Sequence, residues 1–521
     1  MSTRPATGAP PSSTGGCEDA SAAERYAELT FDRMPSAVPR GLPAEPPSWV
    51  RVPGAVEWVR RLPPVVRTPL VDWTPSPARA RGPGAGEALD LRALAALLSL
   101  GAGVTCVEFG PQSSWRHHRV APSARCVFPC SVWVIGRADE GRDPDVARYY
   151  PEHQHLRSRT PFRHRRWTRI HCAVTAAPGT TGAHYGDYAY RLVCQEAGLL
   201  TGALLLAARS LGLRATADPD HRPYEIERLL SLDGQHECAF TLIELTGMTT
   251  EAHFPVPDVP APAVRRPCAA LAELGVLSSA AHRAFAGAPP RRTPAEGTEP
   301  SEPAVGPAQP CSPSPSRLRW QRLRAARDSG DPGFVPAPHP IDAHTLRRLC
   351  TAALTTAFPG LWHGLPQPTL LVARRAVSGA EPGLFRHDHP ARHLGRPPLP
   401  PPRQLLPGSS LNSFLRHCQM VASTNAHLAP ATVFLVADLD DWLRHDAVRA
   451  YTELHLRTGE AALRLLMAAS AEGLVARVHN GLLTGPVRDV CGPGRWVAPF
   501  AVLLSERRPS ARYRFALEGG V

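Results

Sequence analysis

The chain has 521 residues, 43% of them apolar and 20% charged, which gives length for about two to four domains and argues against disorder throughout. Its 58 prolines and 41 glycines predict long loops and disfavour a compact helical bundle. The formal net charge is +12 with no lysine, so a mechanism that needs a lysine amine is excluded. A GC-rich coding sequence explains the arginine excess, and such a surface still attracts acidic partners.

The twelve cysteines include no CxxC pair, so we expect no structural zinc or other metal site. The first residues lack the apolar core of a signal peptide, and no apolar run approaches the roughly 18 residues of a membrane span. Free thiols without a signal or a span predict a cytoplasmic location and no membrane partner.

The residue pattern of the N-terminal half changes near residue 86, from polar and proline-interrupted to periodically apolar. Residues 1–20 are rich in Ser, Thr, Gly and Pro and are predicted to be disordered, and the proline-interrupted residues 21–85 are predicted to form an extended arm. Residues 86–285 are predicted to form an ordered unit. Its expected elements are a helix from Asp90, a buried strand over 126–136, a long apolar helix over 189–214 and a strand over 238–245.

The second half repeats the first. A Pro/Glu/Ser-rich stretch over 286–338 is predicted to be a linker, and residues 339–521 follow as a second unit. Residues 189–214 align without gaps on residues 450–475 at an offset of 261. Nine of 26 positions match, including Gly198 with Gly459 and Tyr190 with Tyr451. We therefore predict an α+β fold made of two related units, a covalent pseudo-dimer.

Five motifs follow one another in the first unit: GAGVT (101–105), RVAPSARCVFPCSVWVI (119–135), VARYYPEHQHL (146–156), HYGDYAYR (184–191) and EAGLLTGALLLAARSLGL (196–213). Their order resembles the SagB-type azoline dehydrogenases, which are FMN enzymes of the nitroreductase superfamily. The resemblance covers roughly residues 20–250, extends weakly to 340–521 through the duplication, and is greatest to the fused versions of thiopeptide pathways.

This resemblance implies a duplicated nitroreductase-like fold and an activity. The family oxidises thiazolines and oxazolines to azoles in ribosomally made peptides, so the implied cofactor is FMN and the implied substrate is an azoline-containing precursor peptide. A cyclodehydratase partner is implied as well. Whether two fused chains dimerise further stays open, as does the preferred azoline.

His184 and Tyr185 stand where the family has a Lys-Tyr pair, the proposed acid/base pair beside the azoline. A histidine, whose ordinary pKa is near 6.5, can accept the ring proton at neutral pH, and Tyr185 can donate a hydrogen bond. A histidine that caps the next helix or is merely solvated is the alternative. The second unit carries His445-Asp446 at the same offset, so we expect only the first unit to react.

Cofactor contacts are predicted in both units. A Pro-Ser turn exposes a backbone N–H and a hydroxyl that can hold a flavin ring edge, although Arg125 replaces the family's glycine. Basic residues are expected to hold the phosphate, with the second unit's own flavin site vestigial. The predicted cofactor-binding residues are Arg79, Arg81, Arg119, Pro122, Ser123, Ala124, Gly212, Leu213, Arg507 and Arg508.

Other functions stay open at this stage. Residues 157–171 hold six arginines with Phe162 and Trp167, which suits a solvated loop, an acidic peptide or partner, or nucleic acid. No nucleic-acid-binding motif accompanies them, so we expect no nucleic-acid partner. The departures from the family pattern, including Thr201-Gly202 in place of Gln-Asn, favour a non-catalytic scaffold in a peptide-modifying complex as the alternative.

Overall fold

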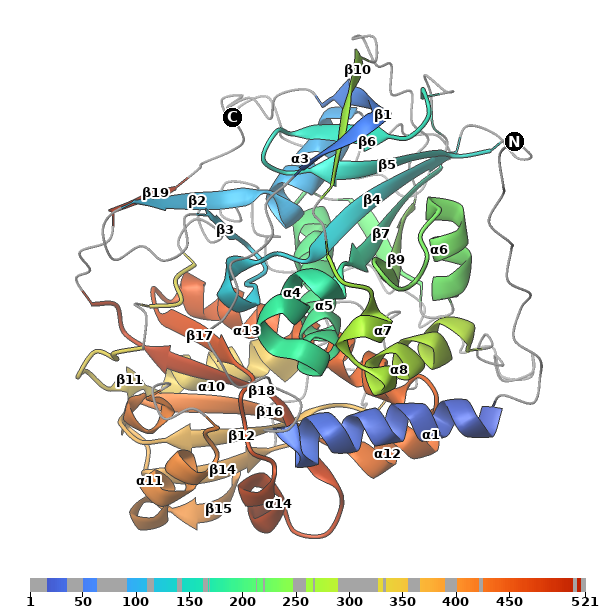
Figure 1. The fold of residues 1–521 in the computed structure, drawn as a ribbon. Coiled ribbons are helices and arrows are strands. Elements are labelled where there is room, and N and C mark those ends of the chain that lie inside the picture. Colours follow the sequence, from blue (N-terminus) through green and yellow to red (C-terminus); the bar gives the residue numbers. More distant parts are fainter. Residues whose placement is uncertain are drawn as a thin grey trace, which may run out of the picture.

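The computed structural model describes residues 16–34, 50–62, 91–109, 117–137, 143–162, 167, 169–211, 213–218, 221–246, 259–265, 268–288, 327–330, 334–354, 366–388, 401–420, 425–508 and 513–516. Two mixed layers of helix and sheet make up this part of the chain, one above the other in Figure 1. We call the upper layer copy one and the lower layer copy two.

The sheet of copy one has the strand order β10-β1-β6-β5-β4-β7-β9-β8, and every neighbouring pair is antiparallel. Alternate residues of its strands face opposite sides, as strand geometry requires. Val132 and Val134 face the long helix α5 (Ala189–Ser210), whereas Trp133 and Ile135 face outward toward α6 (Pro223–Leu230). The strands are β1 (Val50–Arg61), β4 (Cys130–Arg137), β5 (Asp145–Tyr150), β6 (His155–Ser158), β7 (Arg169–Ala176), β8 (Arg214–Ala217), β9 (Cys238–Thr246) and β10 (Val259–Arg265).

The sheet of copy two repeats six of these strands, from β6 to the edge strand β8, and has no counterpart of β10 and β1 among its described residues. Its order β15-β14-β12-β16-β18-β17 corresponds strand for strand to β6-β5-β4-β7-β9-β8, so the predicted duplicated α+β fold is confirmed. The strands are β12 (Thr369–Arg374), β14 (Gly383–His387), β15 (Arg403–Pro407), β16 (Ala431–Asp438), β17 (Val475–His479) and β18 (Trp496–Ser505). The short β11 (Ile341–Asp342) pairs with β13 (Val377–Ser378) beside them.

The two copies meet where α5 (Ala189–Ser210) crosses α13 (Ala450–Ala471). The glycines conserved between the two halves explain the contact. A Cβ on Gly198 would overlap the carbonyl oxygen of Leu456, and one on Gly459 would lie 2.5 Å from the carbonyl oxygen of Gln195. Only glycine lets the two backbones approach this closely. The stretch 178–210 is long and apolar enough to cross a membrane, yet 94% of its 18-residue apolar window is buried inside the protein.

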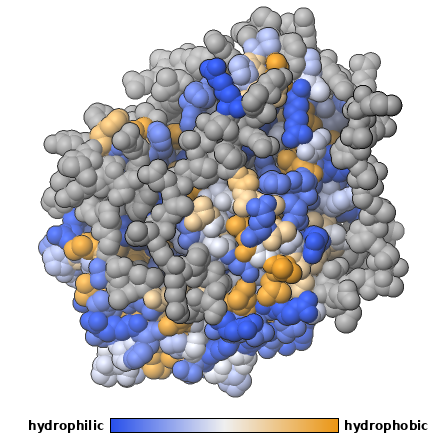
Figure 2. Space-filling model, viewed as in Figure 1, coloured by the Kyte–Doolittle hydropathy of each residue, from blue (hydrophilic) through white to orange (hydrophobic). Residues whose placement is uncertain are grey.

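The remaining helices cover the sheets and the junction. Hydrophobic residues gather over the middle of the face seen in Figure 2, where α7 and α8 lie in Figure 1, and Val276 at the start of α8 is exposed. These helices are α3 (Leu91–Ala102), α4 (Pro178–Tyr185), α6 (Pro223–Leu230), α7 (Leu271–Leu274), α8 (Val276–Gly287), α10 (Ala343–Leu354), α11 (Gly408–His417), α12 (Leu439–His445) and α14 (Gly485–Cys491), with short turns η4 (Ala124–Cys126), η5 (Gly186–Tyr188) and η7 (Ala426–Leu428).

The N-terminal segment corrects two sequence predictions. Residues expected to be disordered or extended instead form α1 (Gly16–Ala27) and η1 (Glu28–Asp32). Tyr26 is fully buried, with its ring 5.5 Å from that of Tyr190 and 5.1 Å from that of Tyr451, the tyrosines that the duplication repeats. This segment therefore packs on the axis that relates the two copies. The composition of the segment does not predict the helix, because aromatic contacts with distant residues bury it.

The unit boundaries also differ from those expected. Strand β1 lies inside the copy-one sheet, between β10 and β6, although the sequence places residues 21–85 in an arm outside it. At the other end of the chain, β19 (Tyr513–Ala516) leaves copy two and pairs with β2 (Val104–Phe109), which also pairs with β3 (His117–Arg119). The two copies are thus joined by strand pairing as well as by the α5–α13 crossing.

Candidate active site

The Pro-Ser turn of copy one is a tight loop before β4. Arg125, Cys126 and Phe128 all have positive φ, at 53°, 53° and 50°. These are left-handed conformations in which residues other than glycine are uncommon. The Ser123 hydroxyl accepts the Phe128 N–H at 2.8 Å and closes the loop. Arg125 therefore occupies a backbone position that suits the glycine of the family pattern.

Glu196 of α5 forms a hydrogen bond with this loop. Its carboxyl is buried, and its Oε1 accepts the Ala124 N–H at 2.8 Å. Burial raises the pKa of Glu196 to about 8, opposed by the hydrogen bonds from Ala124 and Ser123 and by the charge of Arg119. The loop itself and Glu196 therefore engage the Ser123 hydroxyl and the Ala124 N–H in this structure, and the expectation that the turn presents these groups to a flavin ring stays a prediction.

This burial predicts a pH dependence of stability. Below pH 4.5 the Glu196 carboxyl is protonated in both states, and between 4.5 and about 8 only the unfolded chain releases the proton. The unfolding free energy is therefore expected to fall as pH rises through that window and to level off above it. Glu196→Gln keeps an oxygen acceptor for the Ala124 N–H and is expected to reduce the loss of unfolding free energy with rising pH. The measurement is the denaturant midpoint of both proteins at about pH 5 and about pH 8.

The matched control is Glu225→Gln, since Glu225 is exposed and paired with Arg222 at 3.0 Å on the surface. This variant should keep the wild-type pH slope. Equal slopes for the wild type and Glu196→Gln would show that the folded chain does not retain a proton on Glu196.

His184 and Tyr185 end helix α4, next to this loop. Both ring nitrogens of His184 are shielded from solvent and have no hydrogen-bond partner among the described residues. Burial and the nearby charge of Arg125 lower the pKa of His184, so its imidazole is neutral at neutral pH. Burial raises the pKa of Tyr185, and a hydrogen bond with Arg125 opposes that rise. A neutral base and a protonated hydroxyl are thus placed side by side.

Copy two and the N-terminal segment complete the surroundings. Tyr185 and Tyr188 pack in one apolar cluster with Met34, Met420 and Leu483. The Tyr188 hydroxyl donates to the carbonyl of Asn480 at 2.9 Å. The Asn480 side chain in turn donates to Gln195 of α5 at 3.0 Å. The site is therefore built at the junction, as the resemblance implies for a pseudo-dimer.

The predicted basic residues are divided in space. The Arg119 guanidinium forms an ion pair with the Glu152 carboxylate at 2.7 Å. The backbone carbonyl of Arg119 accepts a hydrogen bond from the Arg327 guanidinium at 3.0 Å. Arg327 precedes Ser329, whose carbonyl accepts Arg477 of β17 at 2.8 Å. This path links the loop of copy one to the edge strand of copy two. Arg507 and Arg508 are exposed and follow β18, the strand that pairs with β17. Arg79 and Arg81 lie outside the described residues.

One predicted cofactor contact lies beyond the far end of α5 and stays a prediction, and another lies outside the described residues. Leu213 follows the far end of α5, and the helix from Glu196 to Ser210 alone spans about 21 Å at 1.5 Å per residue. Leu213 therefore lies away from the loop and from His184. Its neighbour Gly212 is not among the described residues.

The corresponding region of copy two has different contacts. Asp446, at the position of Tyr185, accepts the N–H groups of Val448 and Arg449 at 3.1 and 3.0 Å and so caps the start of α13. Arg449, at the position of Tyr188, donates to the carbonyl of Ala288 after α8 at 3.3 Å. The dipeptide that is predicted to react in copy one is therefore replaced in copy two by a helix cap.

The other motifs are structural. Trp167 of the arginine-rich stretch is fully buried and donates to Asp145 at 2.8 Å, so it is not a platform for stacking bases. His153 and His155 stack on each other at 5.3 Å. Within the described residues, no group of three or more His, Cys, Asp or Glu side chains is arranged to hold a metal ion.

Sequence reasoning did not assign Glu196, Arg125 and Asn480 to the site. Glu196 begins the quoted EAG motif, which was a usable signal, and Arg125 stands at a position that the motif gives to glycine. Asn480 belongs to the second half, and only the contact between the copies shows that it lies here.

Comparison with solved structures identifies the fold of this chain, whereas comparison of sequences finds no match. No protein-family profile and no curated protein matches the sequence. The crystal structure of a putative nitroreductase from Anabaena variabilis matches 94% of this chain and 99% of its own length, with a TM-score of 0.65 at 17% identity. The chain therefore has a nitroreductase-like fold over both copies, as expected.

Two other solved structures match part of the chain. A putative nitroreductase from Ralstonia eutropha matches 42% of this chain and 98% of its own length, at 20% identity and a TM-score of 0.26. A chain of the E. coli microcin synthetase McbBCD complex with truncated pro-MccB17 matches 44% of this chain and 92% of its own length, at 14% identity and a TM-score of 0.25. TM-scores this low have no bearing on the fold or function of this chain.

The side chains at the junction suit a bound flavin in part. The ring nitrogens of His184 are shielded and have no partner among the described residues, which leaves them able to meet a bound group. Exposed Arg507 and Arg508 can meet a phosphate. Ser123 and Ala124 do not add ring contacts through their hydroxyl and N–H, so ring binding would rest on other backbone groups and on the apolar cluster around Tyr185.

Proposed function

We propose that this protein is an FMN-dependent oxidoreductase and that it oxidises azoline rings in a peptide to azoles. The observation that carries the proposal is the position of His184. Its neighbour Tyr185 packs in one cluster with Met420 of copy two, and both ring nitrogens of His184 are shielded with no partner among the described residues. The nitroreductase-like fold supports the cofactor, and the ordered motifs of copy one support the substrate.

The residues at the junction divide the work. FMN, when bound, supplies the acceptor for the hydride that an azoline loses from carbon. His184 accepts the ring proton that leaves with that hydride, because its imidazole is neutral. Arg125 orients Tyr185 through their hydrogen bond, and the hydroxyl can then bind the ring heteroatom. Arg507 and Arg508 would hold the phosphate.

The direct test is an assay on a synthetic azoline peptide. The purified chain, supplied with FMN, should remove two hydrogen atoms per ring, which mass spectrometry detects. Absence of product from both thiazoline and oxazoline peptides, with flavin bound, would contradict the substrate and leave the redox class in place. We extend the proposal to a cyclodehydratase partner that delivers the peptide.

A non-catalytic scaffold is the second candidate. It is favoured by one observation, that Glu196 and the loop itself occupy the polar groups of Ser123 and Ala124. Such a protein would not bind FMN and would not turn over substrate. The shielded ring nitrogens of His184 would then have no ligand. Flavin content separates the two candidates.

A further inference from the structure

A cavity of about 780 Å³, here called the outer cavity, lies on the outer face of the copy-one sheet, away from α5. Its volume is in the range of small-molecule and peptide side-chain sites. Strands β1, β4, β5 and β6 and the segment 231–237 after α6 form its walls. None of the residues assigned above to catalysis lines it.

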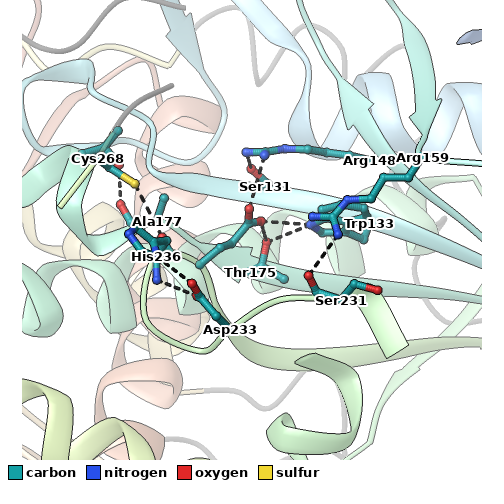
Figure 3. A network of polar contacts seen from close by, with 12 residues as sticks. Ser131, Trp133, Arg148, Arg159, Thr175, Ala177, Ser231, Asp233, His236 and Cys268 are labelled. Atoms are coloured by element: carbon teal, nitrogen blue, oxygen red, sulfur yellow. Dashed lines mark hydrogen bonds and ion pairs between the residues drawn. The ribbon is translucent and has the colours of Figure 1, made fainter. Parts of the chain in front are cut away.

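The walls combine aromatic rings with charged groups. Trp133, Tyr150 and Phe128 give apolar surface, and Val56 at the rim is 54% exposed. Figure 3 shows Arg159 beside Trp133, with Asp233 and His236 across from them. An amphipathic ligand suits a site of this kind better than a purely polar one.

Among the described residues that line the cavity, one cation is left without a carboxylate. Arg148 is paired with Glu237 at 3.3 Å, and Arg157 with Glu57 at 3.2 Å. Asp233 binds the ring of His236 at 2.6 Å. Within the part of the chain that the structure describes, Arg159 instead donates only to the carbonyl of Ser231, at 3.1 Å (Figure 3). A guanidinium has five N–H donors, so Arg159 can still bind a carboxylate with two of them.

The cavity adjoins the candidate active site through helix α4. Ala177 and Thr180 line the cavity at the start of this helix, and His184 lies one turn after Thr180, about 6 Å along the helix axis. Phe128 and Pro129, which also line it, follow directly after the Pro-Ser loop. A chain held in the cavity therefore lies within a few residues' reach of His184.

We propose that this cavity binds an acidic segment of a peptide. A glutamate or aspartate carboxylate binds Arg159, and an adjoining apolar side chain packs against Trp133 and Tyr150. The net charge of +12 adds long-range attraction for such a segment. Binding stands independently of the flavin chemistry; only the added statement, that the bound peptide presents its ring to His184, rests on the proposed function.

The test is a titration of the full chain with a fluorescein-labelled peptide, followed by anisotropy. The peptide carries two glutamates on either side of a phenylalanine, and its matched control carries glutamines. Arg159→Gln is expected to weaken binding of the glutamate peptide about tenfold or more and to leave the weak binding of the glutamine peptide unchanged. Arg159 is exposed, so folding is not at risk, and thermal melts verify it.

Arg222→Gln is the matched control variant, because Arg222 is also exposed but does not line the cavity. It should bind the glutamate peptide as the wild type does. Equal affinity of Arg159→Gln and wild type, or equal affinity of the two peptides, would overturn the proposal. Displacement by free succinate at the concentration at which the peptide itself binds would also overturn it, in favour of a small free carboxylate.

Turnover separates this proposal from the proposed function. If both are right, Arg159→Gln raises KM for an acidic azoline peptide about tenfold and leaves kcat and flavin content unchanged. An inactive wild-type chain that still binds the glutamate peptide through Arg159 would overturn the function and keep the site.

Discussion

Replacing His184 by alanine is expected to lower azoline turnover by about 10²- to 10⁴-fold while flavin stays bound, since that is the usual contribution of a general base. The shielded imidazole is neutral because burial and Arg125 lower its pKa. The wild-type rate should accordingly hold across neutral pH and fall only below the ordinary histidine pKa of about 6.5, as the imidazole becomes protonated. The measurement is kcat/KM against pH for the wild type and kcat for the variant.

The control for this variant lies in copy two. His445 occupies the position that corresponds to His184, beside the helix-capping Asp446, so His445→Ala should keep the wild-type rate. Loss of turnover in both variants would mean that the two halves share the chemistry. A wild-type rate for His184→Ala with flavin bound would remove the base from the mechanism.

Replacing Gly198 by valine is expected to destabilise the whole chain by about 3 kcal/mol or more, the upper end of the range for overpacked cores. Even a Cβ at this position overlaps the backbone of α13, and neither helix can move without disturbing both sheets. Thermal or denaturant unfolding measures the loss. Flavin content should fall as well, because the junction carries the site.

Gly485→Ala is the matched control for that substitution. A Cβ at Gly485, the first residue of α14, has no other atom within 4 Å, so alanine there should leave the stability near that of the wild type. A Gly198→Val protein as stable as Gly485→Ala would contradict the close crossing of the two long helices.

The duplication could be predicted because its signal is local and repeated. Gly198 and Gly459 are required by the crossing itself, so both halves keep them at one spacing, and strand order follows from the same unit used twice. The position of His184 beside the Pro-Ser loop could be predicted only through the resemblance, since the two segments are 60 residues apart along the sequence.

The N-terminal helix and the outer cavity could not be predicted, since both depend on contacts between distant segments. Phe31 is buried by His455, whose ring stacks on it at 5.5 Å, and by Arg191, whose guanidinium lies 4.1 Å from its ring centre. The composition of residues 16–34 does not predict these contacts. The charge of Arg159 likewise matters only because the fold pairs its neighbours Arg148 and Arg157 with carboxylates.

The measurement that tests the central claim most directly is the flavin content of the purified chain, from its absorption spectrum and the flavin released on denaturation. We predict about one FMN per chain, held at the junction beside His184. About two per chain would show that copy two also keeps a working site, despite its helix cap at Asp446. A colourless protein that takes up no added FMN would contradict the proposed function.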